Sequence, residues 1–149
     1  MEGREIIMDT LENVLCLQGQ QKNYLVKLSD MVEICTHVSI SKIPCLPLYY
    51  LGIFHYKGNI LPVLQLDENV FSLTDTTILV VKNEDCYFGI QIGQEPVLEN
   101  IQNMTFTTNK QEFLSDIWYI QSLYQYENKI YYFIDIEKTI QFLTSEEII

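Results

Sequence analysis

The chain of 149 residues is long enough for one domain or for two small subdomains that share a core, and its 48% hydrophobic content excludes a disordered chain. Twenty acidic residues against nine basic ones give a formal net charge of −11, which argues against nucleic acid as a partner. No apolar run reaches the roughly 18 residues that a membrane span needs, and the N-terminal residues show no signal-peptide core, so we expect a cytoplasmic protein without direct membrane insertion.

The charge is unevenly distributed along the chain. Residues 1–66 carry six acids and five bases, a net charge of −1, whereas residues 67–149 carry fourteen acids and four bases, a net charge of −10. This acidic half is either a solvated surface or an electrostatic complement to a basic partner protein. The four cysteines form no CxxC pair, and we expect them to be reduced and mostly buried.

The first half of the chain shows the alternation and the short apolar runs that predict strands. Residues 13–17 and 24–28 predict a hairpin, and a short helical turn precedes the next extended segment. A tight turn at Lys57-Gly58, in which glycine can adopt a positive φ, then joins two strands. In the returning strand we expect a core role for Leu61, Val63 and Leu66, and in the preceding strand for Ile53.

The second half begins with the polar stretch "DENVFSLTDT", which predicts a boundary between two subdomains. Two more hairpins follow, with turns at "NED" and "ENK". The chain closes with a helix over residues 135–143, capped by Asp135, that places Ile136, Ile140 and Leu143 on one face. The fold class is therefore all-β, and two small packed barrels are the economical arrangement because closure removes exposed sheet edges.

Motifs for catalysis are not found. The sequence contains no GxSxG, HExxH, P-loop or GxGxxG, and no pair of its 20 acids is singled out for acid–base chemistry, so we expect neither an enzyme nor a cofactor. One alternative is a small β-barrel module that binds a ligand or a metal. Cys35 and His37 would share a strand face and, with Cys45 and His55, could bind zinc, but these spacings match no zinc module and we assign no metal.

The central segment carries eight residues in a characteristic order, namely Ile43, Pro44, Pro47, Gly52, Lys57, Gly58, Pro62 and Leu66. This order resembles the CheW-like coupling domain of bacterial chemotaxis. Upstream, "YLVKLSDMVEICTHVSISKIPCLP" is similar to the family without a gap, with Glu33-Ile34 in place. Downstream, "TTILVVKNEDCYFGIQI" and the closing "IYYFIDIEKTI" extend the resemblance to residues 13–143.

The resemblance implies a single CheW-like domain of two five-stranded barrels of the Src-homology-3-like type with an apolar groove between them. We expect the first barrel at roughly 13–70, the second at roughly 75–134, and the helix at 135–143. The implied function is a non-catalytic scaffold, or adaptor, in chemotaxis signal transduction. It would couple the cytoplasmic tip of a chemoreceptor to the regulatory domain of a histidine kinase. An adaptor of a pilus or other non-flagellar pathway is an alternative.

The resemblance also implies a receptor-binding site in the groove between the barrels. Carried over by position, that site consists of Met31, Val32, Glu33, Ile34 and Lys57. The kinase domain is expected to pack barrel against barrel on the second lobe. The chain departs from the family where Lys57 replaces an arginine, which keeps the charge but loses the planar fork of donors. Gly93 replaces an aspartate, and "WYIQSLY" replaces a strand of small residues.

Overall fold

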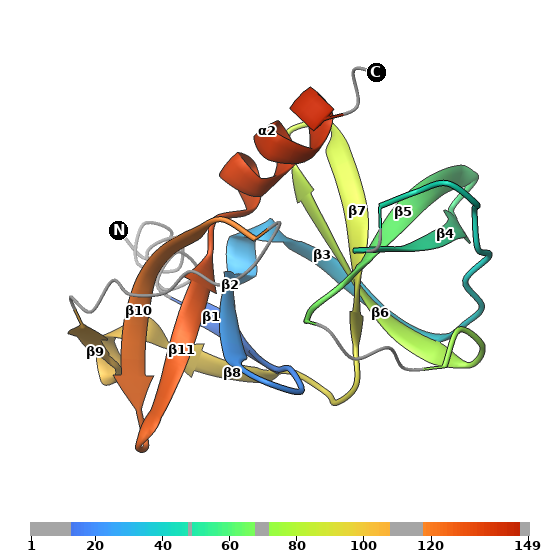
Figure 1. The fold of residues 1–149 in the computed structure, drawn as a ribbon. Coiled ribbons are helices and arrows are strands. Elements are labelled where there is room, and N and C mark those ends of the chain that lie inside the picture. The colour runs from blue at the N-terminus through green and yellow to red at the C-terminus, as the bar shows by residue number, and fades with distance from the viewer. Residues whose placement is uncertain (1–12, 48, 68–71, 108–117, 147–149) are drawn as a thin grey trace, which may run out of the picture.

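The structure is a computed structural model that describes residues 13–47, 49–67, 72–107 and 118–146. These residues form strands, two 3-10 turns and one helix (Figure 1). Their bounds are β1 (Asn13–Gln18), β2 (Asn23–Lys27), η1 (Leu28–Asp30), β3 (Met31–Val38), β4 (Tyr50–Tyr56), β5 (Asn59–Gln65), β6 (Thr76–Asn83), β7 (Cys86–Ile92), β8 (Val97–Asn100), η2 (Ile101–Asn103), β9 (Thr105–Thr107), β10 (Ile120–Tyr126), β11 (Lys129–Ile134) and α2 (Ile136–Glu146). No helix among them is long and apolar enough to cross a membrane.

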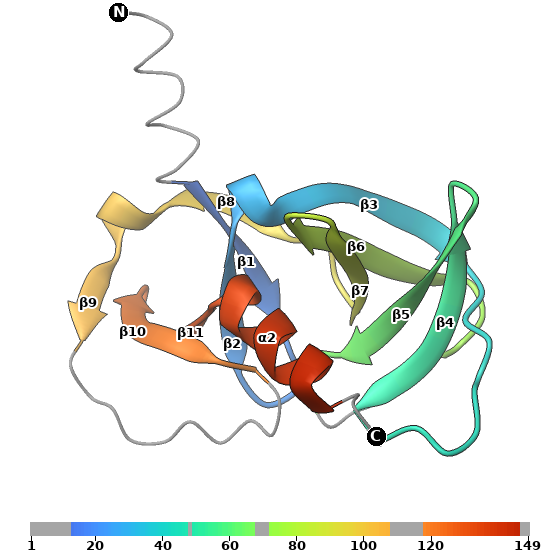
Figure 2. The same ribbon diagram turned by 90° about the horizontal axis from the view of Figure 1, so that it is seen from above.

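The strands form two sheets that lie side by side, with α2 against both (Figures 1 and 2). The terminal sheet has the order β8-β1-β2-β11-β10-β9, and the central sheet has the order β3-β6-β7-β5-β4. Each sheet curls toward closure. The outer strands β8 and β9 are consecutive through η2, and the chain beyond β3 bridges to β4 through two hydrogen bonds of 2.9 Å between Ser41 and Ile53.

The predicted fold class is confirmed, since the molecule is mostly β with one short C-terminal helix. The division of the chain between the two sheets, however, differs from the expected barrels at 13–70 and 75–134. The N-terminal hairpin β1–β2 belongs with the C-terminal strands, because β2 pairs in parallel with β11, as at Tyr24 and Tyr132. The predicted boundary before β6 therefore falls between two strands of the same sheet, β5 and β6. The terminal sheet has six strands rather than five because η2 separates β8 from β9.

Three clusters of buried side chains form the core. The largest lies between the two sheets and under α2, and it takes side chains from β1, β2, β5, β6, β7 and β11. A second fills the central sheet and a third fills the terminal sheet. The cap of α2 is confirmed, since Asp135 Oδ1 accepts a 2.9 Å hydrogen bond from the Lys138 backbone N–H. Ile136, Ile140 and Leu143 are buried on its inner face, as their spacing predicts.

The turn between β4 and β5 has a tight two-residue geometry. Lys57 and Gly58 both have positive φ, 48° and 82°, and Tyr56 pairs with Asn59 across the turn. Two successive positive φ angles match the twist of a hairpin, which explains why glycine follows the lysine. The expected core role in β5 is confirmed for Leu61 and Val63, which are buried together with Leu66, whereas Ile53 is half-buried.

Candidate partner-binding site

Strand β3 begins at the junction between the two sheets. Met31 packs against the large cluster between the sheets, and Val32 packs against the cluster inside the central sheet. A bulge separates Met31 from Glu33 in the pairing with β6, so the regular alternation is broken at this point. Glu33 is half-buried, and Ile34 is 36% exposed. The segment therefore anchors two residues in the core and presents two at the surface.

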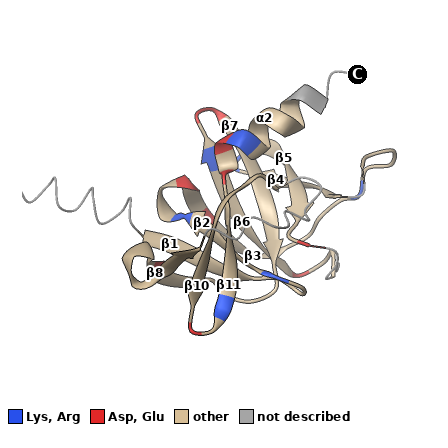
Figure 3. Ribbon diagram, turned by 60° about the vertical axis from the view of Figure 1, so that its left-hand side comes forward, with Lys and Arg blue, Asp and Glu red and all other residues tan. Residues whose placement is uncertain are grey.

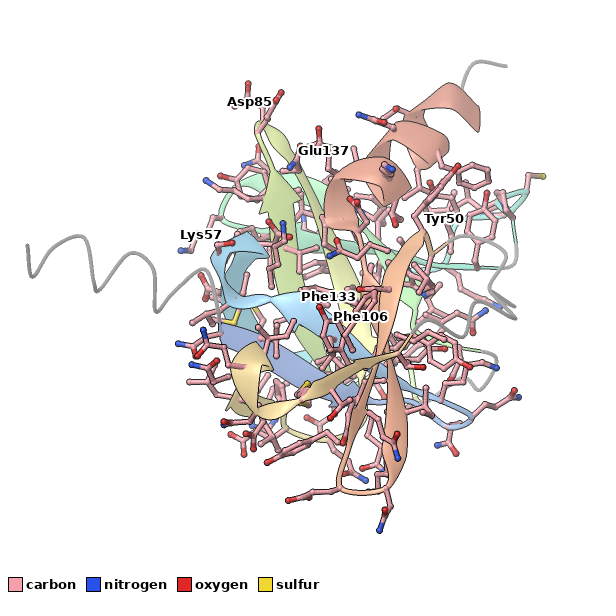
Figure 4. All side chains as sticks on the ribbon, turned by 90° about the vertical axis from the view of Figure 1, so that its left-hand side faces the viewer. Tyr50, Lys57, Asp85, Phe106, Phe133 and Glu137 are labelled. Carbon is pink, nitrogen blue, oxygen red and sulfur yellow. The ribbon has the colours of Figure 1, made fainter. Side chains whose placement is uncertain are left out.

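The structure brings Glu33 and Lys57 together, although 24 positions separate them in the sequence. Lys57 Nζ lies 3.0 Å from Glu33 Oε1, and the Tyr56 hydroxyl donates a 2.7 Å hydrogen bond to the same oxygen. Lys57 Nζ also lies 5.3 Å from the centroid of the Tyr56 ring. We call these three residues the Glu33 cluster. Figure 4 shows Lys57 at the side of the molecule away from the C-terminal end of α2.

The position of each member of the Glu33 cluster has a local cause. The two-residue turn holds Lys57 at the tip of the β4–β5 hairpin. The Tyr56 ring is buried within the central sheet, where it packs against Phe54 with ring centroids 6.0 Å apart. The Tyr56 hydroxyl bonds to Glu33 from this buried ring, so the carboxylate of Glu33 is held by a group that the core fixes in place.

The ionisation of the Glu33 cluster follows from these contacts. The hydrogen bond from Tyr56, and then the contact with Lys57, hold the pKa of Glu33 below its usual value. Glu33 in turn raises the pKa of Tyr56 and of Lys57. All three pKa values move further from 7, so these groups keep their ordinary charge states near pH 7. Such an arrangement suits binding rather than proton transfer, which needs a pKa near the operating pH.

Tyr56 is a candidate site residue that sequence reasoning missed. It stands directly before Lys57 in "HYKG", and its apolar ring gave no reason to place its hydroxyl beside an acid on another strand. Lys57 keeps 69% of its side chain exposed and Glu33 keeps 40%, so both charges remain open to a partner. The described arrangement is therefore a charged surface cluster next to the partly exposed apolar side chain of Ile34.

The alternative metal site is not formed. Across the described residues, no group of three or more His, Cys, Asp or Glu side chains could hold a metal ion, so Cys35, His37, Cys45 and His55 do not converge. The expectation that Cys35 and His37 share a strand face is wrong, because the pairing with β6 shifts between Cys35 and Val38 and His37 has a φ of 57°. Cys35 packs toward the core, whereas His37 is exposed and its Nδ1 lies 2.6 Å from Asp75 Oδ1.

Comparison with known proteins identifies the family. The sequence model of the CheW-like domain family matches residues 13–143. The chemotaxis protein CheW of Helicobacter pylori is 29% identical over 111 residues, an overlap of 60% of this chain and 67% of that protein. The scaffolding protein TtCheW from Thermoanaerobacter tengcongensis matches the fold with a TM-score of 0.66 at 19% identity, covering 83% of this chain and 88% of its own. This chain belongs to the CheW-like domain family.

Proposed function

We propose that this protein is a non-catalytic adaptor of bacterial chemotaxis that couples chemoreceptors to a histidine kinase in the cytoplasm. The family model, the related CheW protein and the structural match support a chemotaxis coupling adaptor, and nothing in these comparisons favours a metal-binding module or a different signalling pathway. The ordinary charge states of the Glu33 cluster support a binding role in place of a catalytic one.

The observation that carries the receptor-binding part of the proposal is the Glu33 cluster, which joins the outer strands β3 and β4 of the central sheet. Glu33, Ile34 and Lys57 are accessible, so they offer a carboxylate, an apolar side chain and an ammonium to the chemoreceptor tip. Met31 and Val32 pack into the two cores, and their role is to hold the strand in place. The five proposed receptor-site residues therefore divide into three that contact the receptor and two that position them.

The regulatory domain of the kinase is proposed to pack against a barrel of this chain away from the Glu33 cluster. Acidic residues occupy turns after residue 66, namely Glu84 and Asp85 between β6 and β7 and Glu127 between β10 and β11 (Figure 3). These turns lie on different sheets. Charge reversal at each turn separately would show which barrel the kinase uses, because like charges across an interface cost affinity.

Calorimetry with two partners from the same organism tests the proposal, namely a soluble fragment of a chemoreceptor tip and the regulatory domain of the histidine kinase. We expect saturable one-to-one binding to both. Lys57→Glu should weaken binding of the receptor fragment about 5- to 100-fold and leave kinase binding unchanged. Lys138→Glu, an equal charge reversal on the exposed face of α2, is the matched control. A well-folded protein that binds neither partner would overturn the adaptor role.

A further inference from the structure

The edge of the terminal sheet at β8 is an unusual surface. Within the described part of the chain, β8 pairs with β1 along one side and is the outermost strand of the sheet order. Val97 and Leu98 are consecutive, yet they are 56% and 54% exposed. Because successive side chains point to opposite faces of a strand, both faces of β8 are open here. Exposed apolar residues on an outer strand form a template for another extended chain.

A cavity of about 190 Å³ lies beside this edge, at the mouth of the terminal barrel. Val97 and Glu99 of β8 line it from one side, and Tyr126 and Tyr131 of the β10–β11 hairpin line it from the other. Two positions separate Val97 and Glu99, so these two side chains share the face of β8 that borders the cavity. Leu98 belongs to the opposite face.

The charges around the cavity are mainly negative. Its charged lining residues are Glu95, Glu99, Glu127 and Lys129. Tyr126 is hydrogen-bonded to Glu99, and its pKa is raised by desolvation and then by Glu127 and Glu99. Two tyrosine rings and three carboxylates provide both the aromatic faces and the negative charge that attract a lysine or arginine side chain.

We propose that the free edge of β8 binds an extended segment of a partner protein that carries lysine or arginine at alternate positions. The segment adds a strand beside β8, which gives affinity through backbone hydrogen bonds. A basic side chain of the segment enters the cavity between Glu99 and the two tyrosines, and an apolar side chain on the opposite face contacts Leu98. This surface is distinct from the Glu33 cluster, and the inference does not depend on the proposed coupling function.

The test uses the full chain, isotopically labelled for NMR, and the blocked hexapeptide Lys-Val-Lys-Thr-Lys-Val. We expect saturable shifts of the backbone amides of β8 and of the β10–β11 turn at millimolar peptide. The same peptide with glutamate in place of lysine should cause no such shifts. Shifts centred on another surface, or none with the lysine peptide, would overturn the proposal.

Variants of this chain test separately the charge contacts in the cavity and the contact at Leu98. Glu95→Gln combined with Glu99→Gln should weaken binding about two- to fivefold, because each removes one exposed charge contact. Leu98→Lys should weaken it further, because the variant loses the apolar contact and sets a charge against an apolar side chain of the segment, and this exposed position tolerates the change. Asp85→Asn is the matched control, since the β6–β7 turn lies at the end of the molecule opposite β8 (Figure 3). Equal affinity of the control and the Glu95/Glu99 double variant would overturn the role of the cavity.

Discussion

The Tyr56 hydroxyl of β4 donates a 2.7 Å hydrogen bond to Glu33 Oε1 of β3, and this contact joins the two outer strands of the central sheet. The backbone bridge between Ser41, which follows β3, and Ile53 of β4 joins the same two edges of the sheet further along the strands. The contact between Tyr56 and Glu33 thus contributes both to closure of the central sheet and to the placement of a surface charge. Lys57 approaches the same oxygen at 3.0 Å, so its ammonium is oriented by an acid that the core already holds.

Removal of the Tyr56 hydroxyl should raise the pKa of Glu33 toward its ordinary value of 4.5, because that hydrogen bond is the main cause of the lowered value. Tyr56→Phe keeps the buried ring and should leave the fold intact. A pH titration of the Glu33 side-chain carboxyl by NMR measures the effect. Tyr119→Phe, at a half-exposed site on another part of the chain, should leave the Glu33 pKa unchanged. An unaltered pKa in Tyr56→Phe would mean that Lys57 alone controls this carboxylate.

Acid should weaken the fold through Glu33. Its pKa is lower in the folded state than in the unfolded chain, so its contribution is present above about pH 4.5 and is lost as the pH falls through the lowered value. Glu33→Gln carries no such carboxylate. Urea denaturation of the two proteins between pH 7 and pH 2.5 should show a stability difference that shrinks on acidification. A difference that stays constant over this range would contradict the linkage.

Local features of the fold could be predicted from the sequence because short-range chemistry determines them. Asp135 followed by apolar residues at helical spacing predicts the capped helix, and the structure confirms both. The pair Lys57-Gly58 between two apolar runs predicts the hairpin turn, and both residues have the positive φ that such a turn requires. In each case the relevant partners lie within about four residues in the chain.

Long-range pairing could not be predicted in the same way. The parallel contact of β2 with β11 joins residues more than 100 positions apart, and the alternation in either strand is compatible with several partners. The same limit applies to the site. The family resemblance implied Glu33 and Lys57 as site residues. The Tyr56 hydroxyl is a candidate only because the curvature of the central sheet places this hydroxyl beside Glu33 of β3. His37 shows a further limit, since a bulge removed it from the expected strand face.

Asp30 should reduce stability at neutral pH. Desolvation is the main cause that raises its pKa, and Asp135 and Glu137 of the neighbouring helix start raise it further, whereas Lys27 lowers it. Because the folded state disfavours the ionised form, stability should increase as the pH falls through the raised value toward 3.8. Asp30→Asn should therefore raise the melting temperature at pH 7, with the gain lost below about pH 3.8. A lower melting temperature at pH 7 would show that this carboxylate has a stabilising partner.

Asp67 anchors the β1–β2 turn of the terminal sheet to the chain just beyond β5 of the central sheet. Its carboxylate accepts backbone N–H bonds from Gln20, Gln21 and Lys22 at 3.1, 2.9 and 3.3 Å. Asp67→Ala should reduce the free energy of unfolding by about 1–3 kcal/mol, because three donors lose a charged acceptor. Asp67→Asn keeps one acceptor oxygen, so its free energy of unfolding should lie between those of the alanine variant and the parent. Urea denaturation measures the series, and an alanine variant as stable as the parent would contradict the anchor.

Gly52 should be the least replaceable residue of β4, because a backbone approach occupies the space where a side chain would lie. It is buried, with a φ of 152°, and a Cβ atom there would lie 2.2 Å from the Ser41 carbonyl oxygen, the acceptor that closes the central sheet. Gly52→Ala should destabilise the fold by about 2–4 kcal/mol, since backbone must move and a closing hydrogen bond is lost.

Gly58 provides the matched control for this substitution. Its φ of 82° is also positive, but a Cβ atom there would meet no other atom within 4 Å. Gly58→Ala should therefore cost only about 1–2 kcal/mol, the price of the left-handed conformation. Guanidinium denaturation of both variants distinguishes the steric clash with Ser41 from the backbone strain of a positive φ. If the two alanine variants lose equal stability, the Ser41 carbonyl does not restrict the side chain at position 52. The central sheet would then close even when its outer strand is displaced.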